Sequence, residues 1–436
     1  MRLKQLYWAL GSATLAFSLV ATPVLSDDWA SGDDWGDDWE EEEETSRLPF
    51  KIGGFIEGAG GAHIYSNRVV DKRIGKSYNL GETRLRLDID GDWKAIDYSL
   101  KVDGVADGVD EEFRAELREA VISFEVGENT DVRAGRQVLT WGTGDLLFIN
   151  DLFPKDWQSF LIGRDEDYLK GPSDAIRTTW YGEAVTLDLV WTPVFNRDNY
   201  PDGDRLSYWG GNGLTAEPIS DNAREPNSFP DDGELALRIA TRQASVEYEL
   251  YGYWGFWPQP NDASGDKLEH PRLHVYGASL RTGLGPGLFN AEVGYYDSRD
   301  YDSSAADVTP NSEVRFLMGY DWEFITNLNV GLQYYLEWTQ DHDEQMNEEM
   351  AGEEYRHLLT TRLTYTQMRG DLMWSLFAFV SPSDEDFYLR PSVRYRASDE
   401  LTLSAGGNIF GGENDYSFFG QFEKDSNVYV RARYRF

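Results

Sequence analysis

From position 50 to the C-terminus, the chain is a succession of short segments in which apolar and polar residues alternate. The clearest example is residues 327–338, where one side carries only apolar or aromatic residues: Leu328, Val330, Leu332, Tyr334, Leu336 and Trp338. Because successive side chains of a β-strand point to opposite faces, each segment predicts a strand with one apolar and one polar face. Beyond the N-terminus no stretch approaches the ~18 consecutive apolar residues of a membrane-spanning helix, so a helical bundle in lipid is excluded.

The segments and their connections follow a regular order. About eighteen segments can be counted, with about sixteen as the alternative, because boundaries carry an error of a few residues. Short connections, such as residues 127–129 and 398–399, alternate with long ones, such as residues 141–173 and 196–233. This alternation is typical of outer-membrane barrels, and an even count places both termini in the periplasm. The sequence therefore predicts an all-β fold, a single antiparallel up-and-down transmembrane β-barrel over residues 49–436.

Strands with two such faces could also build a soluble sandwich, and the aromatic residues decide between the two. Several lie near strand ends on the apolar face, as the aromatic girdles of a membrane barrel require: Trp180, Trp191, Trp254, Trp322, Trp338, Tyr395 and Tyr434. A mean hydropathy of −0.54 fits a barrel, because its strands show lipid only every second side chain. We therefore expect a protein of the cell outer membrane of a Gram-negative bacterium, surrounded by lipid and lipopolysaccharide.

The two ends of the chain agree with export. Residues 1–26 predict a signal peptide, with a basic start, an apolar stretch and a small-residue cleavage site. The terminal Phe436, two residues after Tyr434, resembles the C-terminal signal that the barrel assembly machinery of the outer membrane reads.

Residues 27–48 form an acidic tail that contains three tryptophans, Trp29, Trp35 and Trp39. Six Asp and five Glu lie between positions 27 and 44, and like charges this dense cannot bury a core, so we expect disorder. One interpretation is a solvated spacer. The other is a segment that docks onto a periplasmic partner or binds cations, because a disordered acidic segment rarely repeats Trp without an apolar site to receive it.

Charge and composition exclude several classes of protein. Lys and Arg number 40 against 77 Asp and Glu, a formal net charge of −37, so the chain offers no basic surface for nucleic acid. It has no Cys, which excludes disulfides, thiolate metal sites and Cys nucleophiles. None of its 5 His residues lies with a Ser and an acid in a readable nucleophile arrangement. We expect no enzyme and assign no catalytic residue, metal or cofactor.

If the apolar face meets lipid, the polar face meets an enclosed aqueous space, and arginines are concentrated on it near the point where the barrel closes. We expect these arginines to line a pore: Arg84, Arg86, Arg362, Arg390, Arg394, Arg396, Arg431 and Arg433. The opposite arc carries mainly acids: Asp188, Glu247, Glu249, Glu292 and Glu337. Opposed basic and acidic walls would set a field across the channel, and Arg suits contact with carboxylate or phosphate. The alternative is that Arg and acids pair across neighbouring strands, but a barrel of about 18 strands is too wide for side chains to fill.

The long connection at residues 141–173 is unusually apolar for a loop. We expect it to fold back into the barrel and narrow it. Its polar residues would then meet the permeant: Lys155, Asp156, Trp157, Arg164, Asp165, Glu166 and Asp167. The alternative is an outer lid or a contact between subunits.

The stretch Gly135-Arg136-Gln137-Val138-Leu139-Thr140-Trp141-Gly142, followed by Asp156-Trp157 and by Asp174-Ala175-Ile176-Arg177, resembles the alginate-export family of outer-membrane porins. That family shares a Gly-Arg-Gln strand, a following Gly, a long inserted loop and an Asp-Ala-x-Arg strand. The resemblance implies a substrate-selective diffusion channel whose arginines touch anionic groups, with Arg136 and Arg177 as pore residues. The family's polysaccharide substrate does not carry over, and the acidic tail has no counterpart in the motif.

Together these observations predict an outer-membrane channel for small, anionic solutes with an Arg-lined lumen. The alternative function is the outer-membrane part of a polysaccharide or lipid export system, docked through its acidic tail.

Overall fold

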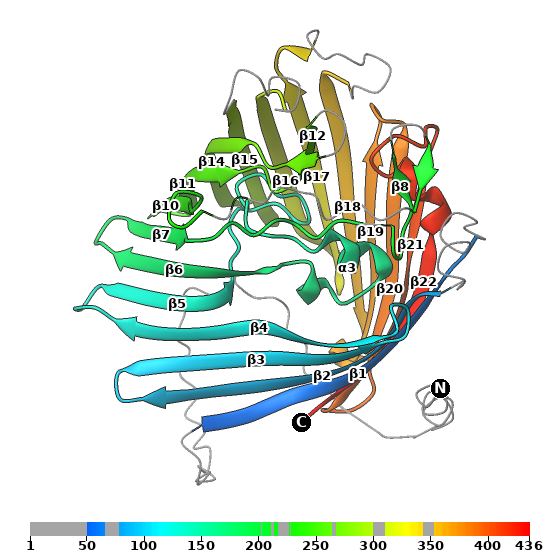
Figure 1. Cartoon of the computed structure of the whole chain (residues 1–436), viewed down its shortest axis with the longest axis horizontal. Helices are drawn as coiled ribbons and strands as arrows, with labels where there is room; N and C mark the ends of the chain where they lie inside the picture. The colour runs from blue at the N-terminus through cyan, green and yellow to red at the C-terminus, as the bar shows by residue number, and fades with distance from the viewer. Residues whose placement is uncertain are drawn as a thin grey trace.

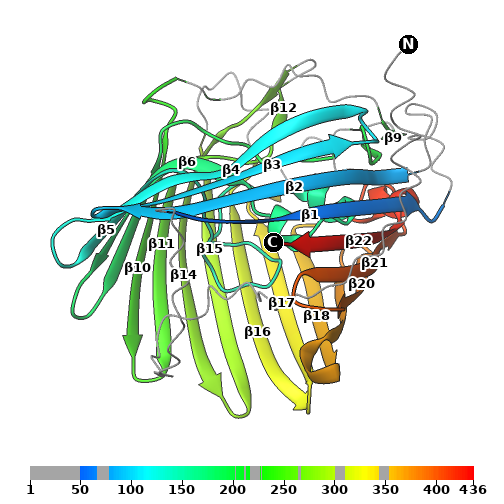
Figure 2. The same cartoon turned by 90° about the horizontal axis from the view of Figure 1, so that it is seen from below.

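The computed structural model describes residues 50–65, 78–201, 203–210, 213–216, 226, 228–263, 267–299, 310–342 and 353–436. Eighteen strands form one antiparallel sheet that closes on itself (Figures 1 and 2). The strands are β1 (Phe50–His63), β2 (Tyr78–Trp93), β3 (Ile96–Asp107), β4 (Glu112–Glu125), β5 (Thr130–Val138), β6 (Pro172–Tyr181), β7 (Thr186–Thr192), β10 (Glu234–Gln243), β11 (Val246–Phe256), β14 (Arg272–Leu284), β15 (Gly287–Arg299), β16 (Glu313–Ile325), β17 (Leu328–Thr339), β18 (Tyr355–Gln367), β19 (Leu372–Ser381), β20 (Asp386–Arg396), β21 (Leu401–Gly412) and β22 (Asn427–Arg435). The predicted barrel and its strand number of eighteen are confirmed.

Smaller elements lie in the connections. Two short hairpins are formed by β8 (Tyr208–Trp209) with β9 (Leu214–Thr215) and by β12 (Asn261–Ala263) with β13 (Lys267–Glu269). The helical turns are α3 (Trp157–Ile162), η1 (Glu166–Tyr168), η3 (Met368–Gly370) and η4 (Gly420–Asp425). None of the described helices is long and apolar enough to cross a membrane. The predicted signal peptide and the acidic tail, with Trp29, Trp35 and Trp39, lie outside the described residues.

The barrel closes where β1 pairs with β22, from Phe55 opposite Arg435 to His63 opposite Asn427 (Figure 2). Beyond these pairs the terminal Phe436 exchanges backbone hydrogen bonds with Gly54, at 3.1 and 3.0 Å. Gly54 has a φ of +156°, and a Cβ there would overlap the carbonyl oxygen of Arg86. Glycine is therefore required where β2 and the C-terminus approach the same point of β1.

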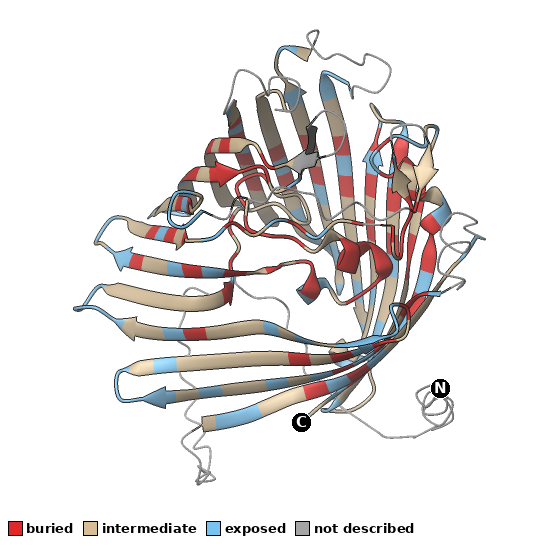
Figure 3. Cartoon of the chain, in the orientation of Figure 1, coloured by how far each residue is buried: buried red, intermediate tan, exposed pale blue. Residues whose placement is uncertain are grey.

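Alternation along the strands separates the two surfaces of the barrel. On β17 the outward Leu332 and Trp338 are exposed, whereas the inward Gln333 and Tyr335 are buried. The inward side is buried because the connection between β5 and β6 enters the lumen, as Figure 3 shows for the segment around α3. We call residues 139–171 the inward loop. Its Ile149, Phe160 and Ile162 belong to one apolar cluster with side chains of the barrel wall. The expected inward fold of this loop is confirmed.

Backbone pairing between neighbouring strands is incomplete at β4 and β5, where the inward loop leaves the barrel wall. Strand β4 pairs with β5 only from Ala120 to Glu125, although it pairs with β3 along almost its whole length. A β-bulge at the β3–β4 pairing, between Lys101 and Val102, places Arg118 of β4 out of register. Arg118 instead donates to the backbone oxygens of Asp167 and Lys170 in the inward loop, at 3.2 and 2.9 Å. On the side away from β3, the outer half of β4 thus borders the loop and not another strand.

Candidate channel constriction

The first limb of the inward loop is fixed to the wall by a buried carboxylate. Glu292 of β15 accepts hydrogen bonds from the backbone N–H groups of Thr143 and Asn150, both at 2.8 Å. Gln333 of β17 exchanges hydrogen bonds with the backbone of Asp145, each 3.0 Å long. Glu292, which the sequence suggested as a water-facing acid, therefore anchors the loop because its oxygens satisfy backbone donors that enter the barrel without a strand partner.

The helix α3 turns the loop across the lumen. Its N-cap Asp156 accepts from the backbone N–H of Ser159 at 2.8 Å, and the helix ends at Gly163, whose φ is +88°. A Cβ on Gly163 would overlap the ring of Tyr429 on β22. Phe160 packs edge-on against Tyr388 of β20, with ring centroids 5.8 Å apart. The helix is thus short and is held against the β20–β22 wall.

The loop tip after α3 carries acids that meet the arginines of this wall. Asp165 pairs with Arg431 at 2.5 Å and with Arg433 at 3.3 Å. Glu166 pairs with Arg390 at 2.6 Å and lies 3.8 Å from Arg362. The predicted basic wall therefore exists, but acids of the loop pair with it, and Glu57 of the neighbouring strand β1 also pairs with Arg433, at 2.8 Å.

The arginines also determine how the acids of the tip ionise. Burial opposes ionisation of Asp165, but Arg431 and Arg433 outweigh burial and hold the pKa of its carboxyl below the usual value. In the same way Arg390 and Arg362 lower the pKa of Glu166 despite its burial. Burial and the neighbouring Asp165 raise the pKa of Asp167, whose side chain is mostly exposed. The tip thus combines two firmly ionised acids with one that protonates more readily.

Tyr168 joins the loop tip to β2 and β3. Its hydroxyl donates to Asp103 at 2.8 Å, and Arg86 donates to that hydroxyl at 3.0 Å. Arg84 hydrogen-bonds Asp103 at 2.7 Å and Glu116 at 2.9 Å, with its guanidinium 4.1 Å from the centroid of the Tyr168 ring. Arg84 and Arg86 do point inward, but Arg84 is only 2% exposed. The prediction that Arg84 lines open water was wrong, because β3 and β4 place acids beside it.

Four predicted constriction residues have structural contacts instead of facing a permeant. Arg164 donates to Glu82 at 3.0 Å and to Ser159 Oγ at 2.8 Å, and Lys155 donates to Asp151 at 2.9 Å. Both cations are buried, Lys155 at 3% exposure, because Lys155 meets Asp151 within the loop and Arg164 meets Glu82 of β2. Asp156 caps α3 and the Trp157 indole donates to Asp198 at 3.0 Å. Sequence reasoning placed the loop correctly but could not tell which of its charges are satisfied internally.

A second loop enters the mouth of the barrel, and sequence reasoning missed it. We call residues 193–210 the crossing loop. Its Asp198 accepts from the backbone N–H of Lys155 at 2.8 Å, and Ser207 at its far end donates to Asp425 of η4 at 2.7 Å. Arg205 is buried and pairs with Asp107 and with Asp110, the latter at 2.5 Å. The sequence did contain a signal that this loop packs against the protein, because apolar residues within an acidic connection need shielding from water. These residues are Leu206, Tyr208 and Trp209.

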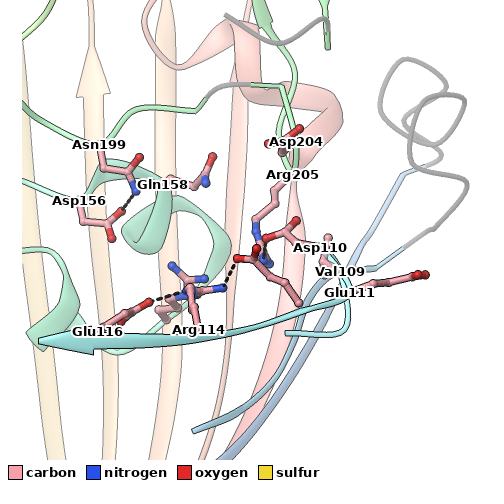
Figure 4. Close-up of a pocket in the computed structure, with 12 residues that line it drawn as sticks. Val109, Asp110, Glu111, Arg114, Glu116, Asp156, Gln158, Asn199, Asp204 and Arg205 are labelled. Carbon is pink, nitrogen blue, oxygen red and sulfur yellow. Dashed lines mark hydrogen bonds and ion pairs between the residues drawn. The ribbon is translucent and has the colours of Figure 1, made fainter. Parts of the chain in front are cut away.

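The two loops and β4 line an open polar cavity of about 690 Å³ (Figure 4). Strand β4 contributes Glu112, Arg114 and Glu116, and Asp156 of the inward loop faces Asn199 of the crossing loop. The Asn199 amide donates to Asp156 at 2.9 Å, which holds the two loops together. An open polar space therefore lies between β4 and the two loops.

The other predicted pore arginines differ in position. Arg177 faces inward and donates to Asp188 at 3.0 Å, and Arg396 pairs with Asp371 at 2.7 Å near a turn. Arg394 faces inward and is exposed, and the described residues offer it no ion-pair partner. Arg394 is therefore the inward arginine of β20 that stays open to the lumen.

Arg136 does not face the lumen. Arg177 lies opposite Arg133 in the β5–β6 register, and Arg136, three residues further along β5, has the opposite parity. It pairs on the outer surface with Asp174 at 2.9 Å and donates to the backbone oxygen of Leu117 at 2.8 Å. The prediction of a pore role for Arg136 was wrong, because Arg136 instead satisfies a carbonyl of β4 beyond the end of its pairing with β5.

The expected separation into a basic and an acidic wall is also incomplete. On the far arc Asp188 accepts from both Arg177 and Arg238, and Glu337 lies 3.4 Å from Arg315. Arg and acids therefore pair across neighbouring strands on both arcs, which was the alternative interpretation of the inward charges.

A closed eighteen-stranded barrel narrowed by an inward loop defines the porin architecture of bacterial outer membranes. Solved structures with the same fold include OccAB3 of Acinetobacter baumannii, with a TM-score of 0.53, 10% identity, and coverage of 89% of this chain and 99% of that one. OccK8 (OprE) of Pseudomonas aeruginosa has a TM-score of 0.54 and 11% identity, with 89% and 97% covered. The outer membrane protein opdK of P. aeruginosa has a TM-score of 0.54 and 9% identity, with 89% and 98% covered.

These likenesses establish the fold of the chain, a closed β-barrel. No protein-family model matches the sequence, and no curated protein matches it. The comparisons therefore support the barrel fold of outer-membrane porins but not the alginate-export family, and the motif that suggested this family includes Arg136, which faces outward.

Proposed function

We propose that the protein is a channel for the diffusion of small anionic solutes across the outer membrane. The observation that carries this proposal is the group of inward arginines on β18, β20 and β22 around the loop tip: Arg362, Arg390, Arg394, Arg431 and Arg433. Guanidinium groups in a water-filled channel enclosed by low-dielectric lipid attract anions and repel cations. We propose no enzymatic activity.

Small solutes are favoured over polymers because two loops cross the lumen. The inward loop contacts the wall from β4 to β20, and the crossing loop reaches η4. An extended polysaccharide would have to displace both. Export through a partner of the acidic tail remains a prediction about Trp29, Trp35 and Trp39, and no described residue favours it.

The surroundings of the barrel remain a proposal as well. We propose that lipid and lipopolysaccharide cover the outward apolar face, and that the barrel assembly machinery reads Phe436. The position of Phe436 at the seam, hydrogen-bonded to Gly54, supports the second point, because a factor that guides closure would act on this strand.

Ion selectivity in planar bilayers tests the channel proposal. The purified barrel should give a reversal potential that favours chloride over potassium in a KCl gradient. The double variant Arg390→Gln/Arg394→Gln should shift that potential towards cations. Arg136→Gln removes the same kind of charge from the outer surface and should leave the potential unchanged. A wild-type channel that prefers potassium, or an unchanged potential in the double variant, would contradict the proposal.

A further inference from the structure

The arginines at the loop tip have more hydrogen-bond donors than the loop satisfies. Arg390 is only 8% exposed, and its Nη1 donates to Glu166, but its buried Nε has no hydrogen-bond acceptor among the described residues. The Nε of Arg431 is in the same position, although Arg431 pairs with Asp165. A buried donor without an acceptor is costly, so this wall could accept further anionic oxygens.

Arg390 cannot turn away from the site. Its guanidinium lies 3.9 Å from the centroid of the Phe160 ring, and Tyr388 precedes it by two residues on the same inward face of β20. Cation–π contact and burial thus hold the guanidinium in one place. If the carboxylate that accepts from Arg390 leaves, another acceptor must therefore take its place.

The two acids of the loop tip differ in how freely they can leave. The Asp165 side chain is 14% exposed and contacts two arginines, whereas the Glu166 side chain is 42% exposed. The second contact of Glu166, to Arg362, is long at 3.8 Å, and Arg362 already hydrogen-bonds Asp145. Asp165 is thus the fixed anchor of the tip, and Glu166 is the carboxylate that can exchange.

Arg394 is the open arginine on the short-turn side of Arg390. Arg394 lies four residues after Arg390 on the same face of β20, about 13 Å along the strand. It is exposed, and the described part of the chain gives it no ion pair. An anion bound at Arg394 would reach Arg390 next, but Arg390 is already paired with Glu166.

We infer that Glu166 is a built-in competitor for the permeating anion. In the empty channel its carboxylate occupies Arg390, and a solute oxyanion passes by replacing it there while Asp165 keeps the loop in place. This inference rests on the proposed function. It adds that affinity for the solute is limited by a residue of the channel itself.

Succinate in single-channel recordings tests this competition. Succinate should reduce the chloride current of the wild type, and Glu166→Gln should lower the half-blocking concentration roughly tenfold, since one charge-assisted bond no longer has to be displaced. Glu247→Gln is the matched control, because Glu247 is also an inward acid but lies on β11 against Arg242. The control should change the half-blocking concentration far less.

Two further variants separate the outcomes. Glu166→Asp keeps the charge but shortens the side chain, so it should give an intermediate half-blocking concentration, and it serves as the test if Glu166→Gln does not fold. Arg390→Gln should weaken the block. If Arg390→Gln weakens it but neither Glu166 variant strengthens it beyond Glu247→Gln, the competition is refuted and the channel proposal stands. If Arg390→Gln also has no effect, the channel proposal itself fails at this site.

Discussion

Arg362 of β18 donates two hydrogen bonds to the carboxylate of Asp145 in the inward loop, at 2.5 and 2.8 Å. These residues lie 217 positions apart in the sequence. The same guanidinium also lies 3.8 Å from the carboxylate of Glu166, in the loop tip after α3. One arginine of the wall therefore faces both limbs of the loop that narrows the channel.

Arg362→Gln should loosen both limbs. Loss of a charge-assisted, two-point contact costs about 1.5–3 kcal/mol of loop docking, so we expect a larger and noisier single-channel conductance without loss of the barrel. Conductance in planar bilayers measures the effect. Arg396→Gln, which breaks a pair with Asp371 near a turn, should leave the conductance unchanged. An identical conductance for Arg362→Gln and the wild type would show that Arg362 does not hold the loop.

Gly163→Ala should displace the loop tip. The residue would carry a positive φ and its Cβ would overlap the Tyr429 ring, so we expect a cost of about 1–3 kcal/mol and faster proteolysis of the inward loop. Gly127→Ala is the control, because Gly127 also has a positive φ of 73° but has open space around it. Equal costs of the two changes would mean that backbone strain alone, and not overlap with the Tyr429 ring, accounts for the effect of Gly163→Ala.

The loop tip should stay docked in mild acid. Because folding lowers the pKa of Asp165 and of Glu166, their contribution is present above the usual carboxyl pKa and is lost only as the pH falls through the lowered values. Asp167 has a raised pKa and should protonate first, which removes one negative charge beside Arg433. We therefore expect selectivity to shift towards anions as the pH falls through the raised pKa of Asp167, as measured by reversal potential.

Asp167→Asn should abolish that shift and give the acidic-pH selectivity already at neutral pH. A shift of undiminished size in this variant would assign the titration to another carboxyl group.

Arg205→Gln should release the crossing loop. Arg205 is buried between Asp107 and Asp110, and breaking a buried pair by removing one partner costs about 3–5 kcal/mol. We expect protease cleavage within the crossing loop and a larger conductance. Arg242→Gln breaks a largely exposed pair with Glu247, which is worth at most about 1 kcal/mol, and should have neither effect. Resistance of Arg205→Gln to protease would show that Ser207 and Asp198 suffice to hold the loop.

Where apolar and polar residues alternate strictly along a strand, the sequence alone predicts which side chains share a face. On β22 the sequence places Arg431 and Arg433 on one face and Tyr434 on the other, and the structure agrees. On β5 the stretch from Arg133 to Val138 has no such alternation, and the position assigned to Arg136 was wrong. Parity is therefore predictable only where the two faces differ in polarity, because the difference between lipid and water is what fixes the register.

The sequence by itself determined that the chain forms a closed barrel and which strand faces point outward, and it favoured an inward path for the apolar connection at residues 141–173. These follow from local periodicity and from the cost of exposing apolar side chains. Only the tertiary structure decided which charges remain open to the channel. Asp165 meets Arg431 across 266 residues and Arg205 meets Asp107 across 98, and no local pattern encodes such pairs. Coulomb attraction in a buried site depends on distance in space, and the path of two loops through the barrel sets that distance.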